Sequence, residues 1–462
     1  MFVKYIDKNR INDIISKSRE DNGLDIDVIL NKSRALKRLT LEETAALLCV
    51  RDEKDLKKIF EAATYVKNTI YGKRVVLFAP LYINNICINF CQYCAFKADN
   101  QVIKRKKLSQ EEISAQTVEL LKMGHKRVLV VASESSNESD IDFYCQSIKT
   151  IYDTKYQNHN IRRININCAP LNVPAFQKLK AIGIGTYQLF QETYHDTTYI
   201  RVHPDGPKSD PDNRLNALDR AFKAGIDDVG VGVLYGLYDY VYETLALLMH
   251  VEHLEKMHGV GPHTISVPRL EPAIGVDLER FEEYRVSDSD FMKLVAVLRL
   301  SVPYTGLILS TRETPEMRDM LFNLGVSQIS AASKTSPGGY SDNDETQEDT
   351  QFCLSDHRSL NDIIRALVDD KMIPSFCTAC YRAERTGKAF MDLAKPGTIK
   401  GKCNINALIT LKEYLDDFAT DDVKETGYKL INDMIESYDE TTQKSLKGIM
   451  TSLDKGERDT YI

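Results

Sequence analysis

The chain has 462 residues, of which 43% are hydrophobic and 27% are charged, with a formal net charge of -7 and no tryptophan. This composition predicts a soluble globular protein with a large core. It excludes a membrane span, which needs ~18 consecutive apolar residues, and it gives no basic surface for nucleic acid. Residues 1–8 lack the charged and apolar regions of a signal peptide, so we expect a cytoplasmic protein.

The first part of the chain, residues 1–71, is predicted to be a helical extension. Its best amphipathic segment is the nine-residue run that begins at Thr40, Thr-Leu-Glu-Glu-Thr-Ala-Ala-Leu-Leu. We expect this extension to cover the bottom or side of the domain that follows it.

Residues 72–333 alternate short β-branched runs with longer segments of helical period, which is typical of βα units around a parallel sheet. The predicted strands are residues 74–77, 127–132, 163–167, 185–190, 227–234, 264–267, 306–309 and 326–331. Ser109 and Glu112 form a capping-box pattern at the start of one intervening helix. Eight such strands predict a closed (β/α)8 barrel of the TIM type.

Polar residues follow several of these strands and would converge on the mouth of the barrel, where TIM barrels place their reactive groups. They are Ser133 and Glu134 after the second strand, Gln191 to Thr193 after the fourth, Arg269 after the sixth and Thr311 to Glu313 after the seventh. The alternative for each one alone is a solvated or helix-capping role.

A C-x3-C-x2-C motif, formed by Cys87, Cys91 and Cys94, directly follows the first predicted strand. Closed four-iron electron carriers use four cysteines, whereas three thiolates leave one iron open for chemistry. With Tyr93 before the last cysteine and Phe96 shortly after it, the loop resembles that of the radical S-adenosylmethionine superfamily. The alternative is structural zinc, which prefers two close pairs of ligands.

The C-terminal part, residues 334–462, is predicted to be a helical module that contains a second cysteine triad. An exposed loop over residues 333–349 precedes a helix near 360–370, and another helical stretch covers 404–453. The triad consists of Cys377, Cys380 and Cys403. The remaining cysteines, Cys49, Cys145, Cys168 and Cys353, lack ligand spacing and are predicted to be reduced thiols.

Six stretches resemble the tyrosine lyases of FeFe-hydrogenase maturation, the HydG family, a branch of the radical S-adenosylmethionine superfamily close to the thiazole-pathway tyrosine lyase. They are residues 87–96, 183–195, 206–210, 224–230, 261–270 and 377–382. The last stretch separates this family from the thiazole-pathway enzyme, which lacks the C-terminal cluster.

For the first site, the resemblance implies a four-iron cluster whose open iron is chelated by S-adenosyl-L-methionine, which one electron then cleaves to a 5′-deoxyadenosyl radical. The residues expected to bind this cofactor are Tyr93, Phe96, Ser133, Glu134, Glu192 and Arg214. The loop reads Ala132-Ser-Glu where glycine is expected before the glutamate, and helix capping is the alternative for Glu134.

The substrate carboxylate is expected to bind a guanidinium that makes two parallel hydrogen bonds, and Arg312 is the candidate. Ser310 and Thr311 are neighbouring donors. The alternative for Arg312 is a salt bridge to Glu313 or Glu316, and Arg269 is the reserve candidate.

The family implies cleavage of the Cα–Cβ bond of L-tyrosine to p-cresol and dehydroglycine, followed by conversion of the latter to carbon monoxide and cyanide. A second four-iron cluster on Cys377, Cys380 and Cys403 would carry an additional iron through a cysteine ligand, with His263 as a further ligand. The product would be an Fe(CO)2(CN)-cysteine precursor of the hydrogenase H-cluster. The implied partners are cysteine, Fe(II), an electron donor such as ferredoxin or flavodoxin, and hydrogenase maturation proteins.

Two departures from the family pattern lie near the second site. Glu384 stands where the pattern has glycine, and residues 330–334 read Ser-Ala-Ala-Ser-Lys. Residues 381–382 and 385–387 are predicted to support the second cluster. Two alternatives remain: a lyase that makes dehydroglycine (2-iminoacetate) for thiazole synthesis, and a non-catalytic iron-sulfur scaffold.

Overall fold

The computed structural model describes residues 5–20, 23–135, 140–341 and 350–462. Its centre is a closed barrel of eight parallel strands, in the order β10-β9-β8-β7-β6-β5-β2-β1, and the last strand pairs with the first. The strands are β1 Arg74–Asn84, β2 Arg127–Ala132, β5 Arg163–Asn167, β6 Tyr187–Glu192, β7 Val229–Val233, β8 Thr264–Ser266, β9 Gly306–Leu309 and β10 Gln328–Ser330. The predicted barrel is therefore confirmed. Predicted strand bounds differ by at most two residues, except that the first strand continues to Asn84.

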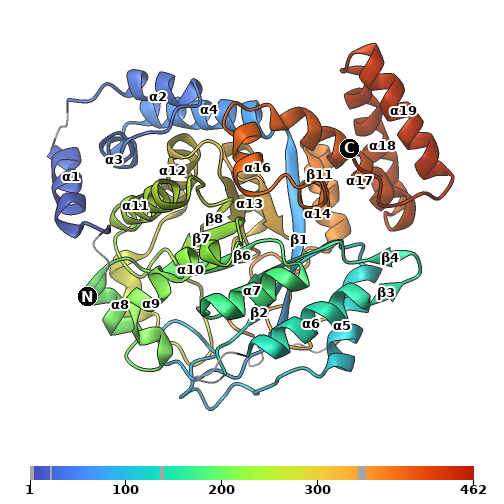
Figure 1. Cartoon of the computed structure of the whole chain (residues 1–462). Helices are drawn as coiled ribbons and strands as arrows, with labels where there is room; N and C mark the ends of the chain where they lie inside the picture. The colour runs from blue at the N-terminus through green and yellow to red at the C-terminus, as the bar shows by residue number, and fades with distance from the viewer. Residues whose placement is uncertain (1–4, 21–22, 136–139, 342–349) are drawn as a thin grey trace.

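Helices surround the barrel, as Figure 1 shows. They are α5 Gln110–Lys122, α6 Ile141–Asp153, α7 Val173–Ile182, α8 Asp196–Val202, α9 Pro211–Leu215, α10 Ala217–Lys223, α11 Tyr240–His258, α12 Asp288–Ser301 and α13 Pro315–Leu324, with short 3-10 turns at Pro207–Ser209 and Glu279–Tyr284. A two-stranded ribbon, β3 Lys155–Tyr156 and β4 His159–Asn160, follows α6. The predicted capping box at the start of α5 is present, because the backbone N–H of Glu112 donates to Ser109 Oγ and that of Ser109 donates to Glu112 Oε2.

The N-terminal helices lie against the outer helices on one side of the barrel, at the upper left of Figure 1. They are α1 Lys8–Glu20, α2 Ile26–Arg34, α3 Leu41–Cys49 and α4 Glu53–Ile70. Ser33 Oγ donates to the Leu300 carbonyl at 2.8 Å, and the hydroxyls of Thr44 and Ser301 lie 2.9 Å apart. The predicted amphipathic segment thus becomes α3 and packs on α12.

A ninth strand, β11 Ile373–Ser375, joins the outside of the barrel and was not predicted. It pairs in parallel with the first residues of β1, from Arg74 to Val76, whereas β2 pairs with the later ones, from Ala79 onward. Because β1 has 11 residues, its beginning extends past β2 and leaves an edge that β11 covers. Pro374 concealed the strand in the sequence, since proline is confined to edge strands and strand starts.

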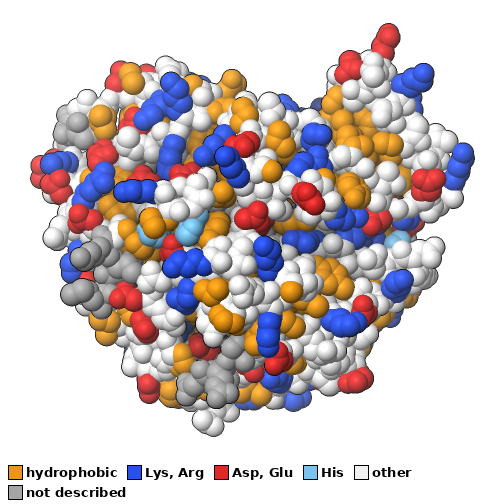
Figure 2. Space-filling view, in the orientation of Figure 1, with side chains coloured by type: hydrophobic (Ala, Val, Ile, Leu, Met, Phe, Trp, Pro, Cys, Tyr) orange, Lys and Arg blue, Asp and Glu red, His pale blue; other side chains and the backbone are white. Residues whose placement is uncertain are grey.

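The C-terminal helices are α14 Leu360–Asp369, α15 Ala379–Arg382, α16 Gly387–Ala394, α17 Ile399–Asp417, α18 Asp421–Glu436 and α19 Glu440–Asp454. One of them, α14, precedes this ninth strand, and the others follow it. Helices α18 and α19 protrude at the upper right of Figure 1. Acidic and basic side chains are interspersed over the face in Figure 2. Among the described helices, none has both the length and the apolar character that a membrane crossing requires.

Candidate active site and a second cysteine site

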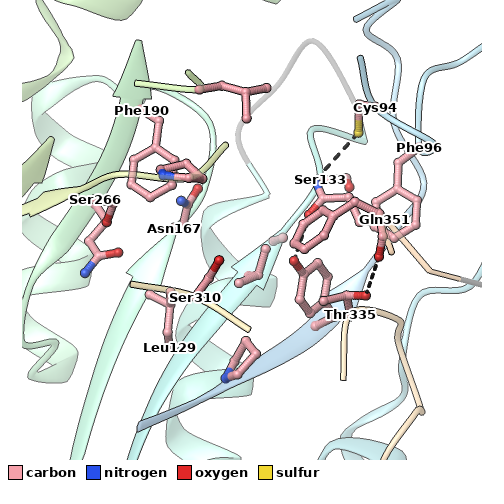
Figure 3. Close-up of a pocket in the computed structure, with 18 of the residues that line it drawn as sticks. Cys94, Phe96, Leu129, Ser133, Asn167, Phe190, Ser266, Ser310, Thr335 and Gln351 are labelled. Atoms are coloured by element: carbon pink, nitrogen blue, oxygen red, sulfur yellow. Dashed lines mark hydrogen bonds between the residues drawn. The ribbon is translucent and has the colours of Figure 1, made fainter. Parts of the chain in front are cut away.

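A pocket with a cavity volume of about 230 Å³ lies at the carboxyl ends of the barrel strands. Figure 3 shows side chains from several strands and from the loop that carries Cys94 pointing into it. The predicted residues that line it are Cys87, Cys91, Tyr93, Cys94, Phe96, Ser133, Glu134, Glu192, Arg214, Ser310 and Arg312. The structure therefore brings together the first triad, all the predicted cofactor residues and the main substrate candidate.

The loop that carries the first triad begins three residues after β1 ends and is fixed by Arg105. The Arg105 guanidinium donates to the carbonyls of Asn85, Phe96, Lys97 and Asn100 at 2.6–3.1 Å. One partly buried cation thereby closes the loop around its cysteines. Sequence reasoning missed this residue, although it stands in the basic run 104–107.

Two amide side chains donate to the cysteine sulfurs. Asn89 Nδ2 lies 3.8 Å from Cys87 Sγ, and Gln351 Nε2 lies 3.6 Å from Cys94 Sγ. Hydrogen bonds of this kind are typical of iron-sulfur sites, where they stabilise negative charge on sulfur. Among the described residues, no three His, Cys, Asp or Glu side chains lie close enough together to hold a single metal ion.

Glu134 directs its carboxylate into the pocket. Its Oε2 accepts a hydrogen bond from Asn89 Nδ2 at 2.7 Å, and its carbonyl accepts one from the backbone N–H of Ile88. The next helix, α6, has Asp140 as its N-cap residue, so the helix-capping alternative for Glu134 is wrong. The backbone of Ser133 donates to the Asn84 carbonyl and joins this loop to the end of β1.

Glu192 ends β6 in the left-handed backbone region, with φ 71°. Its Oε1 lies 2.8 Å from Lys208 Nζ and 3.6 Å from Arg214 Nη2. Burial opposes ionisation, but Lys208 and Arg214 outweigh it and hold the pKa of Glu192 below its usual value. The Glu192 carboxylate is therefore held as an anion between two cations, Lys208 and Arg214. These charged groups can bind the polar groups of a charged cofactor. Lys208 was not predicted, although it stands in the family-like stretch 206–210.

Tyr93 and Phe96 line the pocket from the cysteine loop. The Tyr93 hydroxyl lies 2.7 Å from His203 Nε2, and burial raises the pKa of Tyr93 well above its usual value. Phe96 packs edge-on against Tyr82 of β1. His203 and Tyr82, which fix these two rings, were not predicted.

Arg312 lies partly buried in the pocket, with its guanidinium 3.4 Å from the centre of the Phe352 ring. Its Nη1 donates to the Arg269 carbonyl at 3.2 Å. Desolvation lowers the pKa of Arg312, and no salt bridge to a carboxylate is formed by it within the described residues. A partly buried cation without a direct carboxylate partner favours an anionic ligand, because desolvated charge is stabilised by a counter-ion.

Arg269 differs from this arrangement, because its guanidinium is already paired. It contacts Glu313, with which it forms two hydrogen bonds, and Asp288 at 2.8 Å. The salt bridge considered for Arg312 with Glu313 is therefore wrong, since Glu313 pairs with Arg269. Arg269 is also absent from the pocket lining, which leaves Arg312 as the better candidate for the substrate.

The second triad lies at the opposite end of the barrel, where β11 leads into it. Cys377 Sγ accepts a hydrogen bond from the Ala379 backbone at 3.4 Å, and the Cys377 carbonyl accepts one from Arg127 Nη1 at 3.0 Å. Cys403 comes from α17. The hydrogen bond from Cys380, together with Arg74 and Arg385, outweighs burial and lowers the pKa of the Cys403 thiol. Cys403 is therefore the cysteine favoured as thiolate, the form that binds iron, whereas burial raises the pKa of Cys377 and the hydrogen bond to Cys403 raises that of Cys380.

His263 immediately precedes β8, at the same end of the barrel as the second triad. Its Nδ1 lies 3.4 Å from Asp228 Oδ2, and its ring packs against Phe390 of α16 at 4.2 Å. Burial lowers the pKa of His263, which favours the neutral imidazole that metal ions bind. His263 thus lies opposite the first triad, as predicted from its place before the strand.

The cysteine loop of the second site is braced by residues 459–462. Asp459 contacts Arg382 at 2.7 Å and Arg162 at 3.0 Å. Arg385 Nη2 donates to the Ile462 carbonyl at 2.8 Å. Glu384 has φ 52°, which explains why glycine suits this position, since a left-handed residue with a side chain costs about 1–2 kcal/mol. Its side chain is exposed.

Strand β1 joins the two sites. Arg74, at its start, interacts electrostatically with all three cysteines of the second triad, and Asn84, at its end, lies three residues before Cys87. The ten steps between the first and last of its 11 residues, at ~3.3 Å each, span about 33 Å. The two cysteine sites are therefore separated by about the length of the barrel.

Comparison with known proteins agrees with this geometry. Residues 81–251 match the Radical SAM superfamily, and residues 266–373 match the Biotin and Thiamin Synthesis associated domain. The 2-iminoacetate synthase of Escherichia coli (strain K12) is 30% identical over 364 residues, which cover 78% of this chain and 92% of that protein. A barrel with a three-cysteine loop at its mouth, matched in this way, defines a radical SAM enzyme.

Solved structures narrow the class. A crystal structure of HydG, described as a maturase of the [FeFe]-hydrogenase, is 49% identical, covers 100% of both chains and has a TM-score of 0.96. The FeFe-hydrogenase maturase HydG from Carboxydothermus hydrogenoformans is 40% identical, covers 96% of this chain and 97% of that chain, and has a TM-score of 0.82. The chain belongs to the HydG family.

Proposed function

We propose that this protein is a radical SAM lyase that cleaves the Cα–Cβ bond of L-tyrosine to p-cresol and dehydroglycine. Dehydroglycine is then converted to carbon monoxide and cyanide at the second site, which builds an Fe(CO)2(CN)-cysteine precursor for the FeFe-hydrogenase H-cluster. In this proposal, residues 72–333 carry the lyase and residues 334–462 carry the assembly site. The observation that carries it is the presence of two three-cysteine sites at opposite ends of one barrel.

The first site has the donors that a cluster and S-adenosyl-L-methionine require. Cys87, Cys91 and Cys94 would hold the cluster, while Glu134 and Glu192 offer carboxylates to the ammonium and ribose hydroxyl groups of the cofactor. When bound and reduced by one electron, the cofactor supplies a carbon radical that removes a hydrogen atom from the substrate. The protein contributes orientation and exclusion of water.

Arg312 would bind the tyrosine carboxylate through two parallel hydrogen bonds, as guanidinium groups commonly do. The Phe352 ring lies against its guanidinium and limits the directions in which it can turn. Ser310, one residue beyond β9, lines the same part of the pocket and offers a hydroxyl to the substrate. This pairing would hold the amino acid end of tyrosine beside the cofactor.

At the second site, Cys377, Cys380 and Cys403 would hold the second cluster, and His263 would bind the additional iron together with a cysteine ligand. Asp228 lies beside His263 Nδ1 and would hold the ring with its other nitrogen free to bind metal. Fe(II) and free cysteine are the substrates of this assembly, and a ferredoxin or flavodoxin would supply electrons. Other hydrogenase maturation proteins would receive the product.

The test incubates anaerobically reconstituted protein with S-adenosyl-L-methionine, tyrosine, cysteine, Fe(II) and a reductant. Chromatography follows p-cresol, and infrared spectroscopy follows carbonyl and cyanide bound to iron. The parent should give both signals, and a Cys377→Ala variant should give p-cresol without the infrared bands. Formation of p-cresol without these bands in the parent would favour a lyase for thiazole synthesis. Absence of p-cresol would favour a non-catalytic scaffold.

A further inference from the structure

Gln351 and Phe352 form one edge of the active-site pocket, although they lie far from the barrel strands in the sequence. Backbone hydrogen bonds fix this segment on three sides. Gln351 N–H donates to the Thr335 carbonyl at 3.1 Å, and the Gln351 carbonyl accepts from Ala95 N–H at 3.3 Å. Cys353 N–H donates to the Pro272 carbonyl at 2.8 Å. The segment therefore contacts the cysteine loop directly and has a defined position.

The side chain of Gln351 has a defined orientation as well. Its Oε1 accepts a hydrogen bond from the Tyr82 hydroxyl at 2.7 Å, and its Nε2 lies 3.6 Å from Cys94 Sγ. Figure 3 shows Gln351 between Thr335 and Cys94, with the contact to the sulfur drawn as a dashed line. The amide oxygen accepts from the Tyr82 hydroxyl, and the amide nitrogen, the donor of this side chain, faces the sulfur.

An N–H donor at a cysteine sulfur stabilises the more negative, reduced form of an iron-sulfur cluster, so it raises the reduction potential. Hydrogen bonds to the sulfurs are among the features by which proteins adjust cluster potentials. The first cluster of this protein must accept one electron from an external donor before the cofactor can be cleaved. A more easily reduced cluster accepts that electron from a weaker donor.

We propose that Gln351 is a positioning residue that tunes the first cluster, because its amide N–H bond to Cys94 Sγ raises the reduction potential of that cluster. This inference rests on the proposed function, since it requires a cluster on the first triad. Tyr82 holds the amide in the orientation that donates to sulfur. The residue beside it, Phe352, contacts Arg312 instead and so serves the substrate side of the same pocket.

The test is a redox titration of the reconstituted full-length protein with dithionite, monitored by electron paramagnetic resonance. All proteins carry Cys377→Ala, so that the signal reports the first site. Gln351→Leu removes the donor, and Gln351→Glu also adds a negative charge. We expect Gln351→Leu to lower the ratio of reduced to oxidised cluster at a fixed potential about threefold, equivalent to about 28 mV at 59 mV per tenfold. Gln351→Glu should lower it further.

Two further variants control for general disturbance of the loop. Tyr82→Phe keeps Gln351 but removes its anchor, and we expect a shift in the same direction that is smaller than that of Gln351→Leu. Phe352→Leu changes the adjacent residue and should raise the KM for tyrosine without moving the potential. Equal potentials for the parent and both Gln351 variants, at equal iron content, would overturn the inference. That result would leave the lyase assignment intact, because p-cresol formation by the parent is measured separately.

Should Gln351→Leu fail to retain iron, Gln351→Glu and Tyr82→Phe still decide the question. Gln351→Glu keeps a polar side chain of similar size at the loop, and Tyr82→Phe keeps the native glutamine there. A lower potential in Tyr82→Phe supports the inference, because this change adds no charge, and an unchanged potential in both variants contradicts it.

Discussion

The two cysteine sites have the same number of ligands but different surroundings. The first opens into a pocket in which Glu134, Glu192 and Arg312 are available to small molecules. The second is enclosed between the start of β1, β11 and the C-terminal helices, and its nearby arginines contact protein groups. The two sites have the same number of cysteine ligands, so it is their surroundings that distinguish them. The first has the surroundings of a site for cofactor and substrate, and the second those of a site for assembling a metal product.

The sites also differ in what holds them. The first loop is fixed chiefly by neighbours in the sequence, above all Arg105, which is within 20 residues of every carbonyl that it binds, with Gln351 among its distant contacts. The second depends on residues far along the chain, since Arg127 and Arg162 of the barrel contact Cys377 and Asp459. Changes in residues 377–462 should therefore disturb the second site alone, and the following predictions test that independence.

The largest expected effect concerns the first site. Arg312→Ala should lower kcat/KM for tyrosine about 100-fold, since loss of charge-assisted hydrogen bonds costs about 3 kcal/mol. The rate of p-cresol formation against tyrosine concentration measures this. Arg269→Ala is the matched control, because Arg269 pairs with Glu313 outside the pocket lining and should change kcat/KM far less. A fall below threefold for Arg312→Ala would remove it as the carboxylate-binding residue.

The next effect concerns the bracing of the second site. Glu413 forms a buried ion pair with Arg162 at 2.7 Å, and its Oε1 accepts a hydrogen bond from the Asp459 backbone. Glu413→Ala leaves Arg162 without this partner and should cost about 3 kcal/mol in urea unfolding. Iron bound at the second site should decrease while p-cresol formation persists. Equal loss of both activities would show that the two sites are not independent.

The control for this variant is an exposed ion pair. Lys17 and Asp13 lie on the outer face of α1, with side chains 69% and 59% exposed. Lys17→Ala should leave unfolding and iron content unchanged, because exposed pairs contribute little.

A pH effect is expected from His125, which is buried at the start of β2 and meets Phe376, the residue before Cys377, edge-on. Burial lowers its pKa to about 3, whereas an unfolded histidine has a pKa of about 6.5. This neutral histidine stabilises the fold above pH 6.5, and the stabilisation is lost as pH falls toward 3. Between pH 7 and pH 5 the loss should be about 2 kcal/mol.

The measurement compares urea unfolding at pH 7 and pH 5 for the parent and His125→Gln. The parent should lose about 2 kcal/mol more than the variant on acidification. The same pH dependence in both proteins would assign the acid sensitivity to other groups.

The smallest effects are expected from two helix caps, one in the barrel and one in the C-terminal part. Ser109 caps α5 of the barrel, and Ser359 caps α14 of the C-terminal part by accepting from the Asp362 backbone at 3.2 Å. Ser109→Ala and Ser359→Ala should each cost about 1 kcal/mol in unfolding. Neither should alter iron content. A loss of second-site iron in Ser359→Ala would show that α14 helps to form that site.

Much of the fold could be predicted because its signals are local. The β-branched runs placed all eight barrel strands, and the position of residues after strands placed Glu134, Glu192 and Arg312 in one pocket. Gln351 and β11 were missed because they have no local signal. Gln351 lies 257 positions from Cys94, and β11 contains a proline that argues against a strand.

The pairing of charged residues was also not predicted correctly from the sequence. A sequence shows that Arg312 and Glu313 are adjacent, but not that Arg269, 44 positions before Glu313, is the arginine that pairs with the glutamate. The choice depends on how β8 and β9 lie side by side, which places Arg269 against Glu313 and leaves Arg312 facing the pocket.

The brace at residues 459–462 bears on the order in which the two sites can be completed during synthesis. Cys94 emerges from the ribosome 368 positions before Ile462 (462 minus 94), which is roughly 18 to 74 s at 5–20 residues per second. The first loop could fold around its cysteines within that interval. The second site lacks the contacts of Arg382 and Arg385 until residues 459–462 have been made. The contacts that brace the second site are therefore completed later in synthesis than those of Arg105 around the first triad.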